Sequence, residues 1–170
     1  PFGSWKSPIT SDQIVADSIG VGGTDIIDGA FYWQELRPKE GGRLVTVQRT
    51  ADGSTTDLTP QNFNARTRVH EYGGHAYTVG AGIIYFSNFA DQRLYRYKPG
   101  AEPSPITPEV DYRYADYVFD PDREILFSVR EDHTASGEAV NTLVKLSIDG
   151  DEQGGQVILS GNDFYSSPRL

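Results

Sequence analysis

The clearest pattern along the chain is a short apolar run, a polar break and then a run of alternating character. Ile83–Phe86 holds branched and aromatic residues, which favour a pleated, half-buried strand. Asn88–Gln92 is polar and predicts a turn, and Arg93–Tyr97 alternates, with Leu94 on the apolar side. These runs predict a β-hairpin, followed by a Pro-Gly turn and a short strand at Ile106–Pro108.

The same pattern occurs on both sides of this hairpin. Phe31–Trp33 and Arg43–Val47 match its two strands upstream, and Ile125–Phe127 and Thr142–Leu146 match them downstream. Repeats of roughly 40–50 residues with four short strands are typical of β-propeller blades. A β-sandwich also consists of short, regular strands. Because turn residues recur at matching places as well, we predict an all-β chain, a β-propeller fragment of about three four-stranded antiparallel blades.

The repeats divide the chain into five segments. These are an N-terminal arm with a short helix (1–20), blade one (21–60), blade two (61–108), blade three (109–161) and the first strand of a further blade (162–170). The inner strands are predicted near Thr24–Ile27, His75–Val79 and Ala115–Asp120. Because rings typically need four to eight blades, we expect a piece of a longer ring. Its open blade edges should favour association.

Connectivity predicts which loops share a face. In an up-and-down blade, successive turns alternate between the two faces of the disk. The loops between second and third strands, together with the crossovers between blades, should therefore lie on one face, called here the long-loop face. The loops are Arg37–Gly42, Asn88–Gln92 and Glu131–Asn141, and the crossovers are Gln61–Glu71 and Glu109–Arg113. Binding is expected on this face, because binding residues are usually carried by loops on a rigid scaffold.

Composition excludes several classes of function. The net charge of −9 argues against nucleic acid as a partner, since phosphates require clustered Lys and Arg. The absence of Cys excludes disulfides and thiolate metal sites and is compatible with a reducing compartment, so we expect a cytoplasmic protein. No apolar run approaches the roughly 18 residues of a membrane span, and the N-terminus lacks signal-peptide character, so no membrane partner is expected.

The most conspicuous polar run is Arg66–His75. His70-Glu71 followed by His75 suggests zinc, but the zinc-protease pattern H-E-x-x-H places both His one helical turn apart on one face. Here the two His are further apart, and Gly73-Gly74 opposes a helix. We therefore predict no metal site.

Two interpretations of this run remain open. In the structural one, the two glycines let the chain bend into a tightly packed inner strand and His70 forms local hydrogen bonds. In the functional one, Arg68, His70, Glu71 and Tyr72 contact substrate. The crossover Asp111–Asp116 has the same two alternatives, an ion pair through Arg113 that locks neighbouring blades or a binding role.

Signals for catalysis are missing. No G-x-S-x-G elbow is present, and no His stands beside a recognisable nucleophile. Asp120 and Asp122 lack the downstream spacing of a calcium loop and predict a plain turn. No phosphate-binding glycine loop is present, so we expect neither a cofactor nor a catalytic residue in this chain.

Several motifs together resemble the N-terminal propeller of prolyl oligopeptidase family serine peptidases, in the acylaminoacyl-peptidase or dipeptidyl-aminopeptidase-like branch. They are Trp5–Thr10, Trp33–Arg43, Val69–Gly74, Tyr85–Asn88 and Asp91–Tyr95. The resemblance implies a seven-bladed propeller that caps an α/β-hydrolase domain. It also implies that the Ser-Asp-His triad belongs to that domain, so the chain by itself is expected to be inactive.

The resemblance also implies a role. The family's propeller filters substrates by admitting short peptides, and in some relatives a propeller Glu pair binds the free amino terminus. Glu71 is the possible counterpart, although this chain has no Glu-Glu doublet there. The alternative is a non-enzymatic β-propeller that binds a protein partner or a small ligand. A downstream G-x-S-x-G after about four more blades would favour the peptidase.

Overall fold

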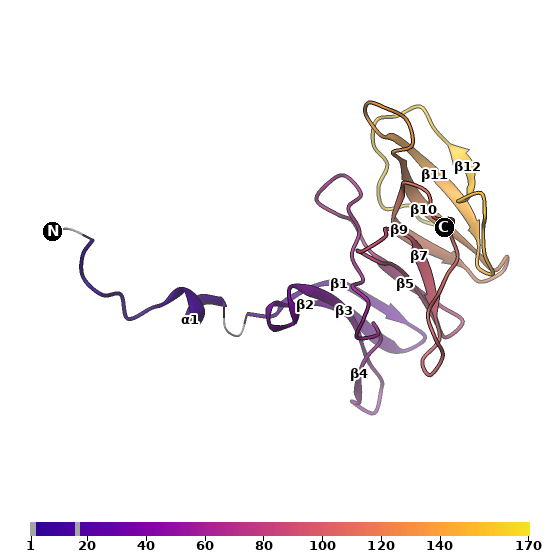
Figure 1. The fold of residues 1–170 in the computed structure, drawn as a ribbon. Helices are drawn as coiled ribbons and strands as arrows, with labels where there is room; N and C mark the ends of the chain where they lie inside the picture. Colours follow the sequence, from indigo (N-terminus) through magenta and orange to yellow (C-terminus); the bar gives the residue numbers. More distant parts are fainter. Residues whose placement is uncertain (1–2, 16–17) are drawn as a thin grey trace.

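The computed structural model describes residues 3–15 and 18–170, which form three antiparallel four-stranded sheets. In each sheet the strands pair in chain order, and the three sheets follow one another as blades (Figure 1). This confirms the predicted propeller fold. The strands are β1 (Gly20–Ile27), β2 (Ala30–Arg37), β3 (Arg43–Arg49), β4 (Thr55–Asp57), β5 (Tyr77–Gly80), β6 (Ile83–Ser87), β7 (Leu94–Tyr97), β8 (Ser104–Pro105), β9 (Tyr112–Asp120), β10 (Ile125–Asp132), β11 (Val140–Ser147) and β12 (Gln156–Leu159).

The N-terminal arm extends away from the blades and carries the short helix α1 (Ser11–Val15) (Figure 1). Its start is a capping box. The Gln13 backbone N–H donates to the Thr10 hydroxyl over 3.2 Å, and the Thr10 N–H donates to the Gln13 side chain over 2.9 Å. A 3₁₀ helix, η1 (Pro38–Glu40), lies between β2 and β3. Within the described ranges, no helix is long and apolar enough to cross a membrane.

The two tightest hairpins have the turn residues that their geometry requires. Asp28 and Gly29 have φ values of 49° and 76° between β1 and β2, and Ala81 and Gly82 have 51° and 73° between β5 and β6. Two successive positive φ values are the requirement of a type I′ turn, which matches the twist of the flanking strands. These turns therefore fix the register of both inner hairpins.

Several strand boundaries differ from the prediction. The outer strand of blade two is β8, and not Ile106–Pro108. Ile106 instead turns into the core between blades two and three, while its N–H still donates to the Leu94 carbonyl over 2.8 Å. In blade three, β10 and β11 are longer than predicted, so Glu131 and Asn141 are strand residues that lie directly opposite each other. The loop there is correspondingly shorter than Glu131–Asn141.

Residues 162–170 form no strand in the structure. The segment lies against the inner strand of blade three, where the Ser167 N–H donates to Asp116 Oδ2 over 2.8 Å. A strand needs a ladder partner to satisfy its backbone groups, and this segment has none among the described residues. That it begins a further blade stays a prediction.

The core lies between the blades. One buried cluster joins blades one and two, and a second joins blades two and three, because each sheet presents apolar side chains from its inner three strands to its neighbour. The largest fully buried side chains include Tyr77, Tyr85, Tyr114, Phe86 and Leu126. Burial of such surface contributes roughly 25 cal/mol per Å², so the inter-blade contacts hold the blades together.

Gly80 is required by this packing. A Cβ at Gly80 would lie 2.2 Å from the Phe119 ring of the neighbouring inner strand. Gly80→Ala should therefore lower the free energy of unfolding by roughly 1–3 kcal/mol, as for other overpacked cores. Urea unfolding measures this, with Gly22→Ala as the control, because nothing lies within 4 Å of a Cβ at Gly22. If the penalty is unchanged in a Phe119→Ala background, this contact is not its cause.

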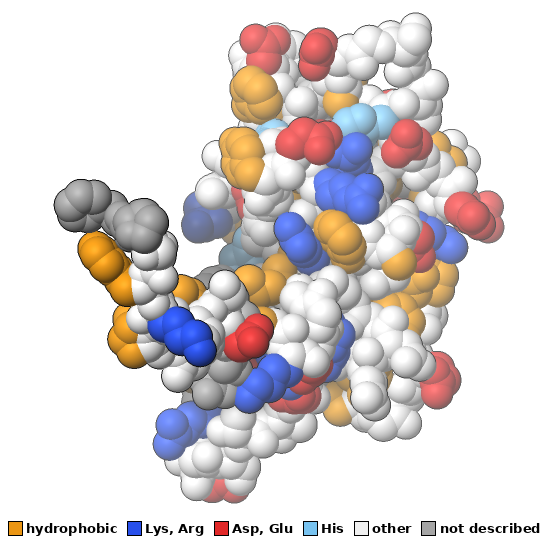
Figure 2. All heavy atoms as spheres, turned by 60° about the vertical axis from the view of Figure 1, so that its left-hand side comes forward, with side chains coloured by type: hydrophobic (Ala, Val, Ile, Leu, Met, Phe, Trp, Pro, Cys, Tyr) orange, Lys and Arg blue, Asp and Glu red, His pale blue; other side chains and the backbone are white. Residues whose placement is uncertain are grey.

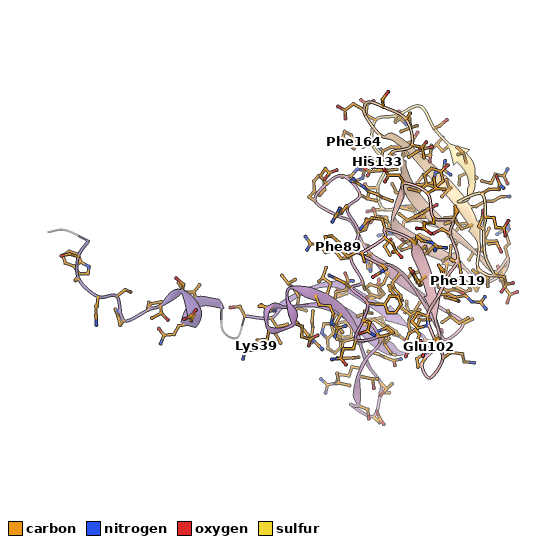
Figure 3. The ribbon with its side chains drawn as sticks, viewed as in Figure 1. Lys39, Phe89, Glu102, Phe119, His133 and Phe164 are labelled. Atoms are coloured by element: carbon orange, nitrogen blue, oxygen red, sulfur yellow. The ribbon has the colours of Figure 1, made fainter. Side chains whose placement is uncertain are left out.

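The two faces of the disk are separated as the connectivity predicts. Lys39, Phe89 and His133 come from the loops between second and third strands of blades one, two and three, and all lie along one side in Figure 3. Glu102, from the turn between β7 and β8, and Phe119, from β9, lie on the other side. The long-loop face is therefore a real surface of the molecule.

Candidate functional site

The crossover between blades one and two is tied down on the long-loop face. The Arg68 backbone N–H donates to the Gln92 side chain over 2.8 Å, which ties it to the loop of blade two. The Arg113 guanidinium donates to the Arg68 carbonyl over 3.1 Å, which ties it to β9 of blade three. The candidate residues from Arg68 to Tyr72 are thus held where two blades meet.

The backbone here has a conformation that few side chains adopt. His70 and Glu71 have φ values of 57° and 64°, and Gly73 follows at 89°. Left-handed residues other than glycine are uncommon and cost free energy, so surrounding contacts must maintain them. The Gly73 N–H donates to the Val69 carbonyl over 2.8 Å and closes the turn. This turn directs His70 and Glu71 toward blade three.

His70 makes long-range contacts. Its backbone N–H donates to Glu131 Oε1 over 2.7 Å, and its Nδ1 lies 3.2 Å from the same oxygen. Its Nε2 lies 3.1 Å from the carbonyl oxygen of Tyr165. The expectation that His70 forms local hydrogen bonds is therefore wrong, because its partners lie in blade three and in the segment that follows it.

Glu131 is the central acid of the site, and the sequence did not single it out. The residue is only 4% exposed, and besides His70 its carboxylate contacts His133, with Oε2 3.0 Å from Nε2. The Arg113 guanidinium lies 3.9 Å from the same Oε2. A buried carboxylate needs hydrogen bonds and counter-charge, and these contacts provide both. From the sequence, Glu131 is predicted to lie in a loop and is therefore not identified as a buried acid.

Glu71 lies at the exposed edge of this cluster. Its side chain is 78% exposed and accepts a 2.6 Å hydrogen bond from Arg113. The hydrogen bond and the charge of Arg113 hold the pKa of Glu71 below its usual value, so this carboxylate is ionised at neutral pH. Arg113 does link neighbouring blades, as predicted, but its partner is Glu71. Asp116 instead accepts the backbone N–H groups of His75 and Ser167.

These residues surround a hollow of about 680 Å³, called here the acidic hollow. Four carboxylates line it, together with two histidines and the buried Asn141, whose Oδ1 has no hydrogen-bond partner among the described residues. Small residues and one aromatic ring complete the lining. The full lining consists of His70, Glu71, Glu131, His133, Gly137, Glu138, Ala139, Asn141, Asp163 and Phe164. Figure 2 shows red acidic side chains around pale-blue histidine in the upper part of this view, with blue basic side chains directly below.

The hollow has an aromatic rim. The rings of Phe164 and Tyr72 lie 5.3 Å and 5.8 Å from the His70 ring, and Tyr72 is 85% exposed. Phe164 and His133 lie close together in Figure 3. Of the four predicted residues, His70 and Glu71 line the hollow, Tyr72 stands beside it, and Arg68 is not part of its lining. The Asn141 Oδ1 and the carboxylates of Glu138 and Asp163 have no hydrogen-bond partner among the described residues. Such acceptors beside aromatic rings suit a ligand that carries an ammonium group.

No metal centre occurs in residues 3–15 and 18–170, where no group of three or more His, Asp or Glu is placed to hold an ion. The candidate calcium residues form a turn. Asp120 Oδ1 accepts the backbone N–H groups of Asp122 and Arg123 over 3.0 Å and 3.2 Å. Asp120 is thereby occupied with its own turn, as the spacing predicts.

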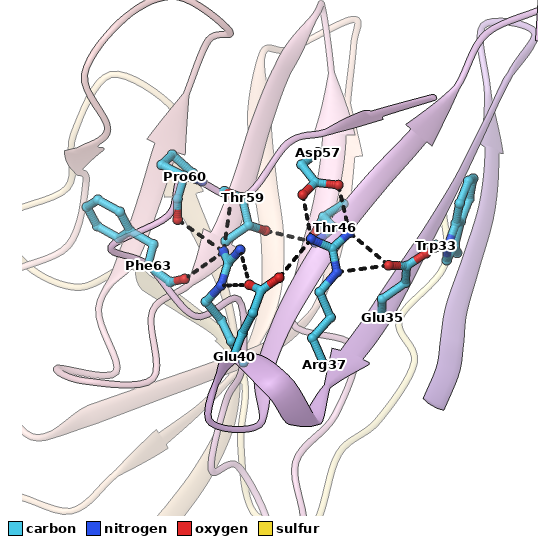
Figure 4. Close-up of polar contacts among 10 residues, drawn as sticks. Trp33, Glu35, Arg37, Glu40, Thr46, Asp57, Thr59, Pro60 and Phe63 are labelled. Atoms are coloured by element: carbon cyan, nitrogen blue, oxygen red, sulfur yellow. Dashed lines mark hydrogen bonds and ion pairs between the residues drawn. The ribbon is translucent and has the colours of Figure 1, made fainter. Parts of the chain in front are cut away.

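The motif Trp33–Arg43 forms a separate polar network within blade one (Figure 4). Arg37 lies at its centre and donates to Glu35 over 2.8 Å, to Asp57 over 2.7 Å and to Glu40 over 3.3 Å. The hydrogen bonds to Asp57 raise the pKa of Arg37 and lower that of Asp57. The network joins β2, η1 and β4, so the motif's role in this chain is structural.

Solved structures resemble the chain over nearly its whole length. A Mycobacterium tuberculosis puromycin-hydrolyzing peptidase is 34% identical with a TM-score of 0.86, over 99% of this chain and 28% of its own. A puromycin hydrolase is 30% identical with a TM-score of 0.81, over 94% of this chain and 27% of its own. The chain thus spans little more than a quarter of either protein.

The match covers all three blades. The chain belongs to the propeller part of the prolyl oligopeptidase family. A nidogen/laminin complex, at 15% identity and a TM-score of 0.57, shares the propeller fold alone. No protein-family model matches the chain, and no curated protein matches its sequence.

Proposed function

We propose that this chain is the substrate-gating propeller segment of a cytoplasmic serine peptidase, and that its acidic hollow binds the free amino terminus of a short peptide. The observation that carries the proposal is a hollow lined by four carboxylates. Among the arginines of the described chain, only Arg113 contacts any of these carboxylates. Its volume of about 680 Å³ lies within the usual range for small-ligand sites.

The chemistry of the hollow fits an ammonium group. Carboxylates concentrated in a concave surface raise the local concentration of cations. Glu131 is buried and held by both histidines, so it is pre-organised, and the Asn141 Oδ1 adds an acceptor that lacks a partner in the described structure. Partial desolvation strengthens the attraction between carboxylate and ammonium, and added salt weakens it.

The proposed partner of the propeller segment is a C-terminal α/β-hydrolase domain that carries the catalytic triad. The two similar proteins are named for hydrolysing puromycin. Puromycin is an amide of an amino acid with a free α-amino group. The proposed substrates are accordingly short peptides and peptide-like amides whose amino terminus is free, and the propeller would exclude folded proteins by size.

Glu131→Gln in the intact protein tests this role. We expect kcat/KM for aminoacyl-p-nitroanilides with a free amine to fall roughly 10–100-fold, as for loss of a charge-assisted hydrogen bond, and N-acetylated analogues to be spared. Glu71→Gln should act in the same direction but more weakly, since Glu71 is exposed and paired with Arg113. Glu152→Gln, at an exposed position outside the hollow, is the matched control.

The contrary outcome is equally clear. If both substrate types lose activity equally and the thermal midpoint of Glu131→Gln falls, Glu131 serves the fold and the hollow does not recognise the amine. Measurement of both substrate types with each variant separates the two roles.

A further inference from the structure

A second charged feature of the long-loop face lies outside the acidic hollow. The guanidinium carbons of Arg66 and Arg68 lie 4.7 Å and 4.5 Å from the centre of the Phe89 ring. We call these three residues the arginine clamp. Phe89 lies on the same side of the molecule as His133 and Phe164 (Figure 3).

The clamp is held in place by the backbone. Ala65, Thr67 and Val69 are buried, so the alternating Arg66 and Arg68 both extend to the surface. Ala65 also forms a β-bridge with Asn88, next to Phe89. Pre-organised side chains lose less conformational entropy on binding, so this arrangement favours recognition over a solvated charge patch.

The adjacent loop is fixed as well. The Phe89 N–H donates to the Asn64 carbonyl over 2.9 Å, and the Arg68 N–H donates to the Gln92 side chain. Both partners of the cation–ring contact are therefore anchored through their own main chains.

The guanidinium groups of the clamp have no direct carboxylate partner within the described structure, although the charge of Arg68 contributes to the lowered pKa of Glu71. Neither guanidinium forms an ion pair or a hydrogen bond there, whereas Arg37, Arg113 and Arg123 each pair with a carboxylate. The two cations lie less than about 10 Å apart, and a cation–π contact does not cancel their repulsion. Each guanidinium keeps its five N–H donors for an external acceptor. Two such unpaired cations stand out in a chain of net charge −9.

We propose that Arg66 and Arg68, across Phe89, form a carboxylate-binding site. The planar, bidentate donor pattern of arginine matches a carboxylate. The clamp adjoins the acidic hollow, because Arg113 contacts both the Arg68 carbonyl and the Glu71 carboxylate. A cationic site beside an anionic one complements the two ends of a short zwitterionic peptide. The bound carboxylate could thus be the carboxyl end of a substrate peptide, and only this assignment rests on the proposed function. The alternative is that the bound carboxylate belongs to an acidic side chain elsewhere in the protein.

The test is a calorimetric titration of the intact protein with N-acetyl-triglycine and, separately, with N-acetyl-triglycine amide. Both amino ends are blocked, so failure of the acidic hollow to bind amines does not affect the result. We expect the acid to bind at least about tenfold more tightly than the amide, which suits one charge-assisted contact. The double variant Arg66→Gln/Arg68→Gln should lose this preference, and added salt should weaken it.

Arg49→Gln is the matched control, an exposed arginine of blade one that has no carboxylate partner in the described chain. If neither probe binds, but the double variant shifts the thermal midpoint in a salt-dependent way that Arg49→Gln does not, the carboxylate belongs to the protein itself. The proposal is overturned if acid and amide bind equally, if the double variant keeps the preference, or if neither probe binds and the midpoint is unchanged.

Discussion

Arg37→Leu is expected to lower the free energy of unfolding by about 2–4 kcal/mol. Removal of one member of a buried ion pair typically costs about 3–5 kcal/mol, because the remaining charge loses its compensation. The Glu35 side chain is 17% exposed but that of Asp57 is 46% exposed, so this network is only partly buried. The Arg37 side chain is 19% exposed, so water compensates part of this loss. Glu35 and Asp57 would be left facing each other's charge without the guanidinium between them.

Urea unfolding of the variant measures this loss. Arg37→Lys keeps the charge but loses the two-pronged contact with Asp57, so it should lie between the wild type and Arg37→Leu. Arg49→Leu is the control, because Arg49 lies on the same face of blade one without a carboxylate partner in the described structure. A loss below about 0.5 kcal/mol for Arg37→Leu, the usual range for surface sites, would show that the network does not stabilise the blade.

Stability is expected to fall steeply as the pH drops below about 5, the range in which paired carboxylates take up protons. Hydrogen bonds from Arg37 lower the pKa of Asp57, and hydrogen bonds from Arg43 lower that of Glu40. Burial would raise the pKa of Asp25, but the hydrogen bond and charge of His75 outweigh it and the pKa falls. Because the unfolded chain then binds more protons, this stabilisation is present above the unfolded pKa values and is lost as pH falls through the folded ones.

Urea midpoints between pH 7 and pH 2 measure this dependence. In Arg37→Leu the slope should be shallower, since the cause of the lowered pKa of Asp57 is removed. Parallel curves for wild type and variant would mean that other carboxylates, such as Asp25 beside His75, dominate the acid sensitivity.

Local chemistry made much of the fold predictable. The short helix of the N-terminal arm begins at a capping box of Thr10 and Gln13, and the alternating strand Leu94–Tyr97 lies within its predicted run. The Asp28-Gly29 turn has an equally local signal in its two residues. Each depends on neighbours a few residues away, through a side-chain cap, a positive φ or a period of two. The alternation of turns also placed the long loops on one face, because strand connectivity alone requires it.

The site was only partly predictable. His70 and Glu71 were identified from an unusual polar run, but the central acid, Glu131, was assigned to a loop. The one available signal was its place at the end of the alternating strand β10, opposite Asn141. A buried carboxylate is identified by its partners, and those of Glu131 are distant in sequence.

By itself, the sequence determined the blade repeat, the hairpins and the face on which the long loops gather, since these follow from residue periodicity and turn chemistry. Only the tertiary structure decided which charges meet. His70 lies 61 positions from Glu131, and Arg113 lies 42 positions from Glu71. Both pairs form because the crossover that carries His70 and Glu71 lies against β9 and β10 of blade three. Coulomb interactions depend on distance in space, and no local pattern encodes that distance.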